Sequence, residues 1–317
     1  SSYFFLKKQA LFLIPSFLGF LFFALVPISF WKRFAPLLFL LALGLTVLTF
    51  IPPFGVKMHG SYRWLHIFGI SVQPSEVLKL FILIYMGFFF ERKQKHLSSF
   101  VYGYLPFMVI LGSAFLVLLK QPDFGSVVTL MVTALTLLFV AEFKWVHLLI
   151  TILCSVPACV YLIMRKAYRL NRILIFLNPW SDAQGRGFQI IQSLIAIGSG
   201  GVWGVGISYS KQKYFYLPMQ HTDFIFPIIA EETGFVGALS LISLYFFFCY
   251  FGLRVAMQLD SIFSRFTTLG FIVLISLQAV INIMVSSGLL PTKGLGLPFV
   301  SYGGTSLVTV WCMIGFM

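Results

Sequence analysis

The stretch KQKYFYLPMQHTDFIFPIIAEETGFVG, residues 211–237, leaves a long polar loop and enters an apolar helix. Asp223 stands at the junction between the two. Nearly all of the remaining chain is apolar, and in a chain of this kind an ionisable residue needs a specific reason for its position. Asp223 is therefore the first residue whose role has to be explained.

The composition is that of a membrane protein. Of the 317 residues, 59% are hydrophobic and only 10% are charged, whereas about a quarter of the residues in a soluble domain are charged. A large soluble all-α domain is excluded by segment length, because apolar runs of about 20 residues match the thickness of a hydrocarbon core. We predict an all-α, polytopic integral membrane protein that forms a single transmembrane domain over residues 1–317.

Nine apolar segments are expected to be membrane-spanning helices. The last of them reaches Met317 without a polar flank, so we expect eight full spans and one that is cut short. The predicted spans are 10–30, 35–51, 74–90, 103–119, 124–141, 145–164, 224–251, 267–287 and 302–317.

The basic residues give the orientation and exclude one class of partner. The formal net charge is +13, and the Lys and Arg residues lie in loops and at helix ends, where they suit anionic lipid headgroups, so we predict no nucleic-acid binding. One set of short loops carries slightly more of them than the other, which places that set in the cytoplasm. The segment 165–223 is then a large extracytoplasmic loop.

The start of the span at 74–90 has two possible roles. Glu76 suits the positive end of the helix dipole, and Lys79 can pair with it across one turn. A capped helix start with a local ion pair is one interpretation. The other is that Lys79 faces an internal cavity and binds a phosphate together with Arg63 of the preceding loop. Asp123, in the next outer turn, is expected to cap the helix that follows it.

The outer segment 165–223 is long for a loop, and such loops are usually functional or disordered. Its apolar stretch Phe188–Ile197 is too short to span a membrane and predicts a re-entrant or interfacial helix. The basic residues of the segment form either a solvated loop or a diphosphate site, and the second is favoured because Gly and Arg occur together at a membrane face. These residues are Arg165, Lys166, Arg169, Arg172, Arg186, Lys211 and Lys213.

The last outer loop, GLLPTKGLGLPFVSYGGTS at 288–306, is rich in Gly and Pro. Irregular backbone at membrane depth survives only where it is buried in protein or lines a water-filled cavity. The loop is therefore a candidate cavity wall, with Lys293 as the one charged residue in its sequence.

Asp223 is the strongest candidate for chemistry among nine acidic residues, although it could instead cap the following helix with Thr222. Glu231 lies about 12 Å further along the helix, beyond the roughly 5–9.5 Å that separates the two carboxylates of a glycosidase. A two-carboxylate hydrolase is therefore disfavoured. Transfer from a diphosphate-activated sugar needs one base, and its leaving group needs cations rather than a proton. His221 is an alternative base or a hydrogen-bond partner of Asp223.

Five motifs, spread over nearly the whole chain, together resemble the FtsW/RodA/SpoVE family, the SEDS proteins. The LPTKG run within the last motif is more similar to the FtsW members than to the RodA members. Because the family has ten transmembrane helices, the resemblance implies a SEDS-type helical bundle in which nine of the ten are present and the last is truncated. The motifs are RWLHIFGISVQPSEVLKL (63–80), QPDFGS (121–126), NPWSDAQGRGFQIIQSLIAIGSGG (178–201), LPMQHTDFIFPIIAEETGFVG (217–237) and GLLPTKGLGLPFVSYGGTS (288–306).

The resemblance implies a peptidoglycan glycosyltransferase of the cytoplasmic membrane that polymerises lipid II at the outer face during cell division. Its expected partners are a class B penicillin-binding protein, divisome proteins and membrane lipids. Asp223 matches the essential aspartate of the family. Met219 and Phe215 stand where other members carry glutamates, which leaves Asp223 more alone. The expected substrate-binding residues are Arg63, Glu76, Lys79, Arg172, Lys213, His221, Lys293 and Ser301.

We expect Asp223 to accept the proton of an acceptor hydroxyl, while Arg and Lys side chains hold the departing diphosphate. No cofactor is required by this scheme, although a divalent cation, Mg²⁺ or Mn²⁺, could assist the leaving group; the four cysteines lack the spacing of metal ligands. The alternatives are a lipid II flippase, with Lys79 or Glu231 as charges near the middle of the membrane, an elongation-type RodA homologue, and a scaffold for division proteins. No internal repeat supports a transporter.

Overall fold

The computed structural model describes residues 4–52, 54–58, 61–67, 70–212 and 221–317. The chain divides into two compact units. The first consists of Ser1–Leu148, Tyr250–Ile275 and Gly303–Met317, and the second of Leu149–Cys249 and Ser276–Tyr302. The long helices α10 and α11 each begin in one unit and end in the other, and the prediction of one transmembrane domain stays a prediction.

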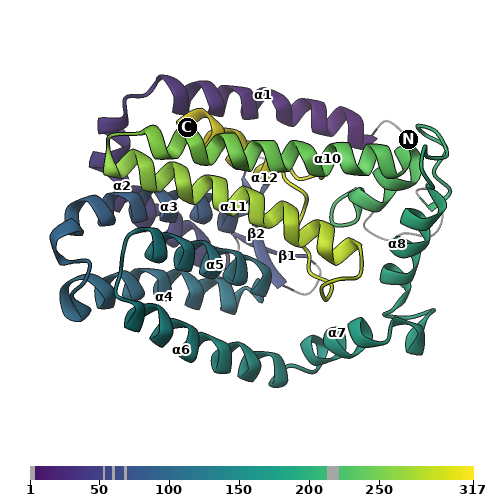
Figure 1. Ribbon diagram of the computed structural model, residues 1–317, viewed down its shortest axis with the longest axis horizontal. Coiled ribbons are helices and arrows are strands. Elements are labelled where there is room, and N and C mark those ends of the chain that lie inside the picture. Colours follow the sequence, from purple (N-terminus) through teal and green to yellow (C-terminus); the bar gives the residue numbers. More distant parts are fainter. Residues whose placement is uncertain (1–3, 53, 59–60, 68–69, 213–220) are drawn as a thin grey trace. The chain divides into compact units, whose positions relative to one another are not determined.

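Helices dominate the described residues (Figure 1). The predicted helical class is thereby confirmed. The helices are α1 Phe4–Leu25, α2 Ile28–Leu48, α3 Pro74–Lys93, α4 Leu105–Lys120, α5 Phe124–Val140, α6 Trp145–Met164, α7 Ala167–Leu177, α8 Phe188–Ser199, α10 Ile225–Gln258, α11 Ile262–Ser286 and α12 Gly304–Phe316, with short turns η1 Gln94–His96, η2 Phe100–Tyr104 and η3 Pro179–Asp182.

Each of the nine predicted spans overlaps one helix over most of its length. Within the described residues, six helical segments are long and apolar enough to cross a membrane. α5 and α12 are apolar but shorter, and α3 carries charged residues at both ends. The six segments are Lys7–Leu25, Ile28–Leu48, Phe100–Lys120, Trp145–Met164, Ile225–Gln258 and Ile262–Ser286.

The predicted boundary between the first two spans is wrong. The helices break at Pro27, which has extended dihedral angles of −61° and 142°, because a proline disfavours helical conformation in the residue before it. Lys32 and Arg33 therefore lie inside α2 rather than in a loop. The ammonium of Lys32 is 2.7 Å from the carboxylate of Glu91 at the end of α3.

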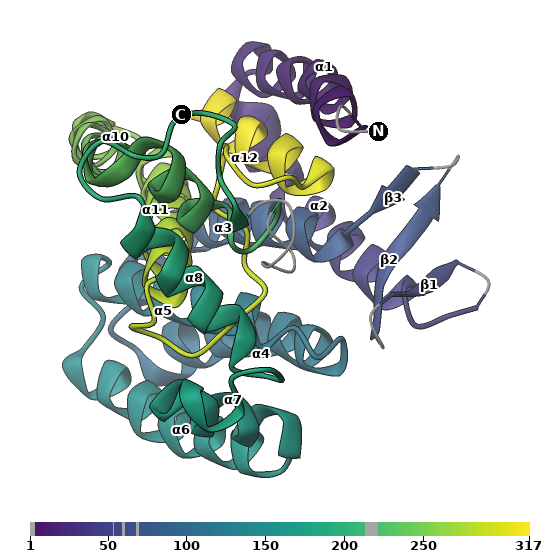
Figure 2. The same ribbon diagram turned by 90° about the vertical axis from the view of Figure 1, so that its right-hand side faces the viewer.

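A three-stranded antiparallel sheet, which the sequence analysis does not predict, occupies the first outer loop. Its strands are β1 Gly55–Met58, β2 Ser61–Ile67 and β3 Ile70–Val72, in the order β1-β2-β3 (Figure 2). Val56 pairs with Trp64, and Leu65 pairs with Val72. The central strand is rich in aromatic and apolar residues, which favour a pleated, half-buried surface, and it carries Arg63.

The first unit packs around α3. Leu78, Ile82 and Leu83 on this helix are completely buried, and α2 lies along it. α1 and α12 run side by side (Figure 2). Their close approach needs small residues, because a side chain on Gly315 would collide with the backbone of Phe20.

In the second unit, α10 is interrupted at Gly234, and a glycine-rich segment forms hydrogen bonds with the backbone at the interruption. Gly234 inside α10 has a φ of 69° and a ψ of −166°, a combination open only to glycine. The backbone groups released by this break pair with the segment 200–206. The hydrogen bonds run from the N–H of Val205 to Glu231, of Gly206 to Glu232, of Phe235 to Gly201 and of Val236 to Val202, at 3.0, 3.0, 2.9 and 3.2 Å.

Candidate active site

Asp223 lies in the turn directly before α10 and is partly buried. In the described part of the chain, no N–H or O–H group donates a hydrogen bond to its carboxylate. The alternative in which Asp223 caps the following helix is therefore not realised, because a cap carboxylate accepts from the first backbone N–H groups of its helix. By contrast, Asp123 accepts from the N–H of Ser126 at 3.2 Å and from its hydroxyl at 2.8 Å, as predicted for a cap.

The electrostatic environment of Asp223 favours a proton acceptor. Burial raises the pKa of its carboxyl from 3.8 to about 6, and the positive charge of Arg172 partly offsets this rise. Arg172 belongs to α7 and donates from Nη1 to the carbonyl of Thr292 at 3.2 Å. Arg172 therefore joins α7 to the last outer loop near the carboxylate of Asp223.

The last outer loop forms one wall of this site. A side-chain carbon on Gly294 would lie 3.3 Å from Oδ2 of Asp223, so the backbone of the loop passes directly beside the carboxylate. Lys293 is the preceding residue and is partly buried. The interpretation of segment 288–306 as a wall is consistent with this contact.

Side chains from α11 and the last loop hold the turn that carries Asp223. Ser301 donates from Oγ to the carbonyl of Thr222 at 2.5 Å and accepts from the N–H of Leu297 at 2.6 Å. Asn282 donates to the carbonyl of Asp223 at 2.9 Å. We predicted Ser301 as a substrate ligand, and its hydroxyl has these two backbone partners. Asn282 was not predicted at all, although an amide side chain inside an apolar helix is a signal that a buried polar partner exists.

Two predicted site residues complete the list for this unit. The carbonyl of His221 accepts from the N–H of Tyr302 at 2.7 Å, so this residue is placed two positions from Asp223 and against the last loop. Lys213 lies outside the described residues, as do Phe215 and Met219. The substrate-binding roles of His221 and Lys213 stay predictions.

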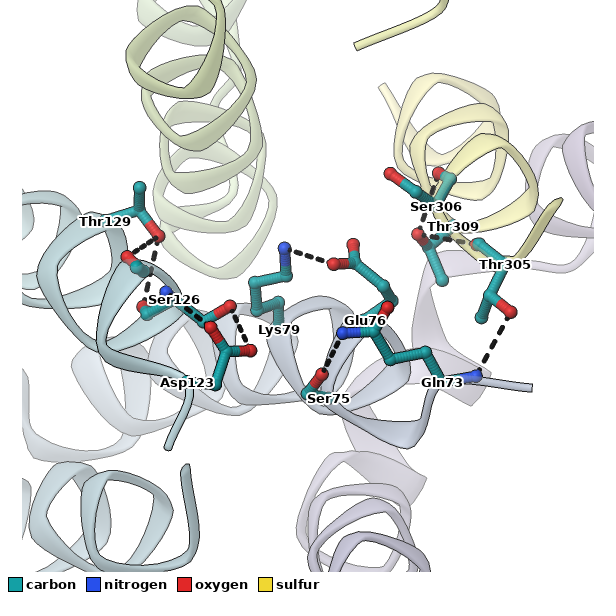
Figure 3. A network of polar contacts seen from close by, with 11 residues as sticks. Gln73, Ser75, Glu76, Lys79, Asp123, Ser126, Thr129, Thr305, Ser306 and Thr309 are labelled. Atoms are coloured by element: carbon teal, nitrogen blue, oxygen red, sulfur yellow. Dashed lines mark hydrogen bonds and ion pairs between the residues drawn. The ribbon is translucent and has the colours of Figure 1, made fainter. Parts of the chain in front are cut away.

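The remaining predicted residues lie in the first unit. Lys79 is buried and its ammonium is 2.8 Å from the Glu76 carboxylate (Figure 3), which confirms the local ion pair. Arg63 donates to the carbonyls of Gln121 and Pro122 at 2.8 and 2.6 Å. The structure thus ties both cations to protein groups in this unit. Their role in holding a phosphate stays a prediction.

Glu231, two turns into α10, has a structural role. Its side chain is buried and accepts from the Ser210 hydroxyl at 2.5 Å and from the N–H of Lys211 at 3.1 Å. These bonds fix the end of the segment that leads toward Lys213. Glu231 is therefore an anchor for this segment rather than a second catalytic carboxylate.

The described residues do not form a metal site. They contain no group of three or more His, Cys, Asp or Glu side chains that could hold an ion. Mg²⁺ is commonly held by one or two carboxylates together with substrate phosphates, so a Mg²⁺ or Mn²⁺ ion shared by Asp223 and a diphosphate stays a prediction. The steps derived below use side chains only.

Comparison with known proteins identifies the family. The chain matches the cell cycle protein family FTSW_RODA_SPOVE over residues 1–317. It is 41% identical over 315 residues to the "Probable peptidoglycan glycosyltransferase FtsW" of Geobacter sp. (strain M18), covering 99% of this chain and 86% of that protein. It is 39% identical over 316 residues to the "Stage V sporulation protein E" of Bacillus subtilis (strain 168), covering 100% and 86%.

Solved structures agree with this assignment. A chain from a peptidoglycan synthase complex that coordinates polymerization and crosslinking is 29% identical, with a TM-score of 0.81 over 98% of this chain and 87% of that one. The rod shape determining protein RodA of Thermus thermophilus is 25% identical, with a TM-score of 0.71 over 98% and 85%. With its apolar spans, the chain is a multi-pass protein of the cytoplasmic membrane. It belongs to the FtsW/RodA/SpoVE family.

Proposed function

We propose that this chain is a peptidoglycan glycosyltransferase that polymerises lipid II at the outer face of the cytoplasmic membrane, with Asp223 as its general base. The observation that carries the proposal is the state of the Asp223 carboxylate: no described group hydrogen-bonds to it, its pKa is raised to about 6, and Arg172 lies near it. A pKa close to the working pH is what a general base needs. The name of the Geobacter relative supports the reaction class.

The reaction needs one proton acceptor and a cationic site for the leaving group. Asp223 takes the proton from the 4-hydroxyl of the GlcNAc of an acceptor lipid II as the oxygen attacks the anomeric carbon of the donor strand. The bond between this carbon and the diphosphate breaks with inversion, and the undecaprenyl diphosphate leaves with the bonding electrons. Arg172, whose charge acts on Asp223, and Lys293, which adjoins Gly294 beside the carboxylate, stabilise the developing negative charge.

The partner is proposed from the same source. The structural neighbour belongs to a complex that combines polymerization with crosslinking. We infer that this chain works with a crosslinking enzyme, a class B penicillin-binding protein, and with further division proteins. A division role rather than an elongation role follows the FtsW name of the relatives at about 40% identity.

The flippase alternative has lost its main support. It relied on charges near the middle of the membrane, but Lys79 is paired with Glu76 and Glu231 is hydrogen-bonded to Ser210. Both charges therefore have structural explanations. A scaffold role does not explain why a carboxyl group with a raised pKa lies beside a cationic residue at this site.

The test is polymerisation of labelled lipid II by the purified chain together with its penicillin-binding protein. Asp223→Asn keeps the shape of the side chain but removes the base, so we expect glycan synthesis to fall by about 10² to 10⁴. Asp260→Asn, at an exposed position outside the site, is the matched control and should remain active. Full activity of Asp223→Asn, or lipid II translocation in vesicles without polymer, would overturn the proposal.

A further inference from the structure

Three consecutive carbonyl groups in the turn before α10 each accept a hydrogen bond from the C-terminal part of the chain. The carbonyl of His221 accepts from the N–H of Tyr302 at 2.7 Å. Thr222 accepts from the Ser301 hydroxyl at 2.5 Å, and Asp223 accepts from the Asn282 amide at 2.9 Å. The peptide groups around the proposed base are therefore fixed on the backbone side, while its carboxylate receives no hydrogen bond from a described group.

Asn282 differs from the other two donors because it joins two segments. Its side-chain nitrogen also donates to the carbonyl of Leu295 at 2.6 Å, so both amide hydrogens are used. Leu295 directly follows Gly294, the residue whose backbone lies beside Oδ2 of Asp223. One buried amide thus holds the base and the loop that faces it in a fixed relation.

The orientation of this amide is set by its partners. Two carbonyl oxygens face the same end of the Asn282 side chain, and only the NH₂ group can donate to both. The carboxamide oxygen at the other end is buried and has no partner among the described residues. A group that is half satisfied in a buried position costs stability, so packing alone does not explain an asparagine at this position.

We propose that Asn282 is a positioning residue for the transfer reaction, which sets the distance between Asp223 and the backbone at Gly294. This inference rests on the proposed function. The amide does not touch the carboxylate and transfers no proton itself. It acts through the peptide group of Asp223, whose direction decides where the carboxylate points.

Two substitutions of Asn282 remove its hydrogen bonds while keeping the size of the side chain nearly the same. Asn282→Asp has nearly the same volume but an ionised side chain that cannot donate, and it sets a carboxylate against two carbonyls. Asn282→Leu keeps the volume and removes all polarity. Both variants release the turn, and a misplacement of about 1 Å at a reacting group can lower the rate by about 10².

The experiment measures kcat, KM and the pH dependence of polymerisation for Asn282→Leu and Asn282→Asp. We expect kcat to fall by at least about tenfold while KM changes little, because the base rather than substrate binding is disturbed. In Asn282→Leu the released carboxylate becomes better hydrated, so the acidic limb of the pH profile should move to lower pH. Asn282→Asp adds a negative charge beside the turn, which raises the pKa of Asp223 and opposes this movement. The charged or titratable residues on the surrounding elements include Arg172, Lys293, His221 and Tyr302, and all four are unchanged in these variants.

Gln278→Glu and Gln278→Leu are the matched controls. Gln278 is a buried amide one turn earlier on the same helix, and the same two changes there should lower stability without moving the pH limb. If the Asn282 variants do not fold, Ser301→Ala removes the neighbouring bond to Thr222 and should shift the limb in the same direction by a smaller amount. An unchanged pH limb and kcat in the folded Asn282 and Ser301 variants, with Asp223→Asn inactive, would overturn this inference alone. Activity of Asp223→Asn in the same preparation would overturn the proposed function instead.

Discussion

Gly294 lies so close to Asp223 that a side-chain carbon at this position would be 3.3 Å from Oδ2 of the carboxylate. This separation is tighter than ordinary van der Waals contact between such atoms, so one of the two groups has to move. We predict that Gly294→Ala lowers kcat for glycan polymerisation by about tenfold, because a small displacement of the base is sufficient. Steady-state kinetics with labelled lipid II checks this.

The control for Gly294→Ala is Gly198→Ala at the end of α8. A carbon added at Gly198 meets nothing within 4 Å, so this change should leave kcat unaltered. Equal activities of the two variants would show that the contact between Gly294 and the carboxylate has no catalytic consequence.

The charge of Arg172 sets part of the acidity of Asp223. Arg172 lowers the pKa of the carboxyl against the larger effect of burial, so Arg172→Gln should raise that pKa further above 6. Since the ionised carboxylate is the active form, the acidic limb of the pH profile moves to higher pH, and activity falls more at pH 6 than at pH 8. Arg172→Lys keeps the positive charge, so the acidic limb should stay close to its pH in the unsubstituted protein.

Arg186→Gln is the matched control for Arg172→Gln. Arg186 belongs to the same outer segment, but the charge identified as acting on Asp223 is that of Arg172. A shift of the limb in Arg186→Gln equal to that in Arg172→Gln would indicate a general field of the basic loop rather than a specific neighbour.

Stability should respond to Asp223 in the opposite sense from activity. The folded protein raises the pKa of this acid from 3.8 to about 6, so between these pH values the folded state binds more protons than the unfolded state and stability falls as pH rises. Above pH 6 the cost is roughly 3 kcal/mol at most. Asp223→Asn should therefore raise the thermal midpoint at pH 7.5 in detergent and have little effect at pH 4. A lower midpoint at pH 7.5 would contradict the assigned burial.

Sequence reasoning located Asp223 because its position depends on a local change, from a polar loop to an apolar helix. The helices were predicted from another local feature, their long apolar runs. The boundary between the first two helices was wrong because the break at Pro27 lies inside a continuous apolar run. The aromatic strand around Trp64 was missed because its partner strands are very short and no alternating pattern extends beyond them.

The surroundings of Asp223 could not be predicted from local patterns. Asn282 and Ser301 contact the turn across 59 and 79 positions of sequence, and no periodicity connects segments so far apart. Glu231 shows the same limit: its spacing from Asp223 disfavours a paired catalytic role, but its bond to Ser210 comes from the way the glycine-rich segment folds back on α10. Long-range hydrogen bonds of this kind become visible only in the folded chain.

The buried pair of Lys79 and Glu76 separates a structural role from a substrate-binding role. Removing one partner leaves an uncompensated buried charge, so Lys79→Met should lower the free energy of unfolding by about 3 kcal/mol. The double variant Lys79→Met with Glu76→Gln removes both charges and should recover most of the thermal midpoint. If Lys79 also holds a phosphate, polymerisation stays low in the double variant despite the recovered stability.

The exposed pair of Lys32 and Glu91 is the control for this experiment. Its lysine side chain is 46% exposed, and ion pairs of this type contribute about 0–1 kcal/mol. Lys32→Met should therefore change the midpoint very little. Recovery of both stability and activity in the Lys79 and Glu76 double variant would remove Lys79 from the substrate site.

The break in α10 depends on a single glycine. A side-chain carbon on Gly234 would lie 2.3 Å from the backbone nitrogen of Gly204 and 2.4 Å from the carbonyl oxygen of Val202, and the φ of 69° with a ψ of −166° excludes other residues. We predict that Gly234→Ala separates the glycine-rich segment from α10 and lowers the thermal midpoint, with strain and clash together costing more than about 1–3 kcal/mol. Hydrogen exchange of the Phe235 and Val236 amides, which are bonded to this segment, should become faster. Gly112→Ala in α4 is the control: its added carbon meets nothing within 4 Å, and the change from Gly to Ala inside a helix should stabilise the protein slightly. Unchanged hydrogen exchange at the Phe235 amide in Gly234→Ala would show that the pairing with the glycine-rich segment does not depend on Gly234.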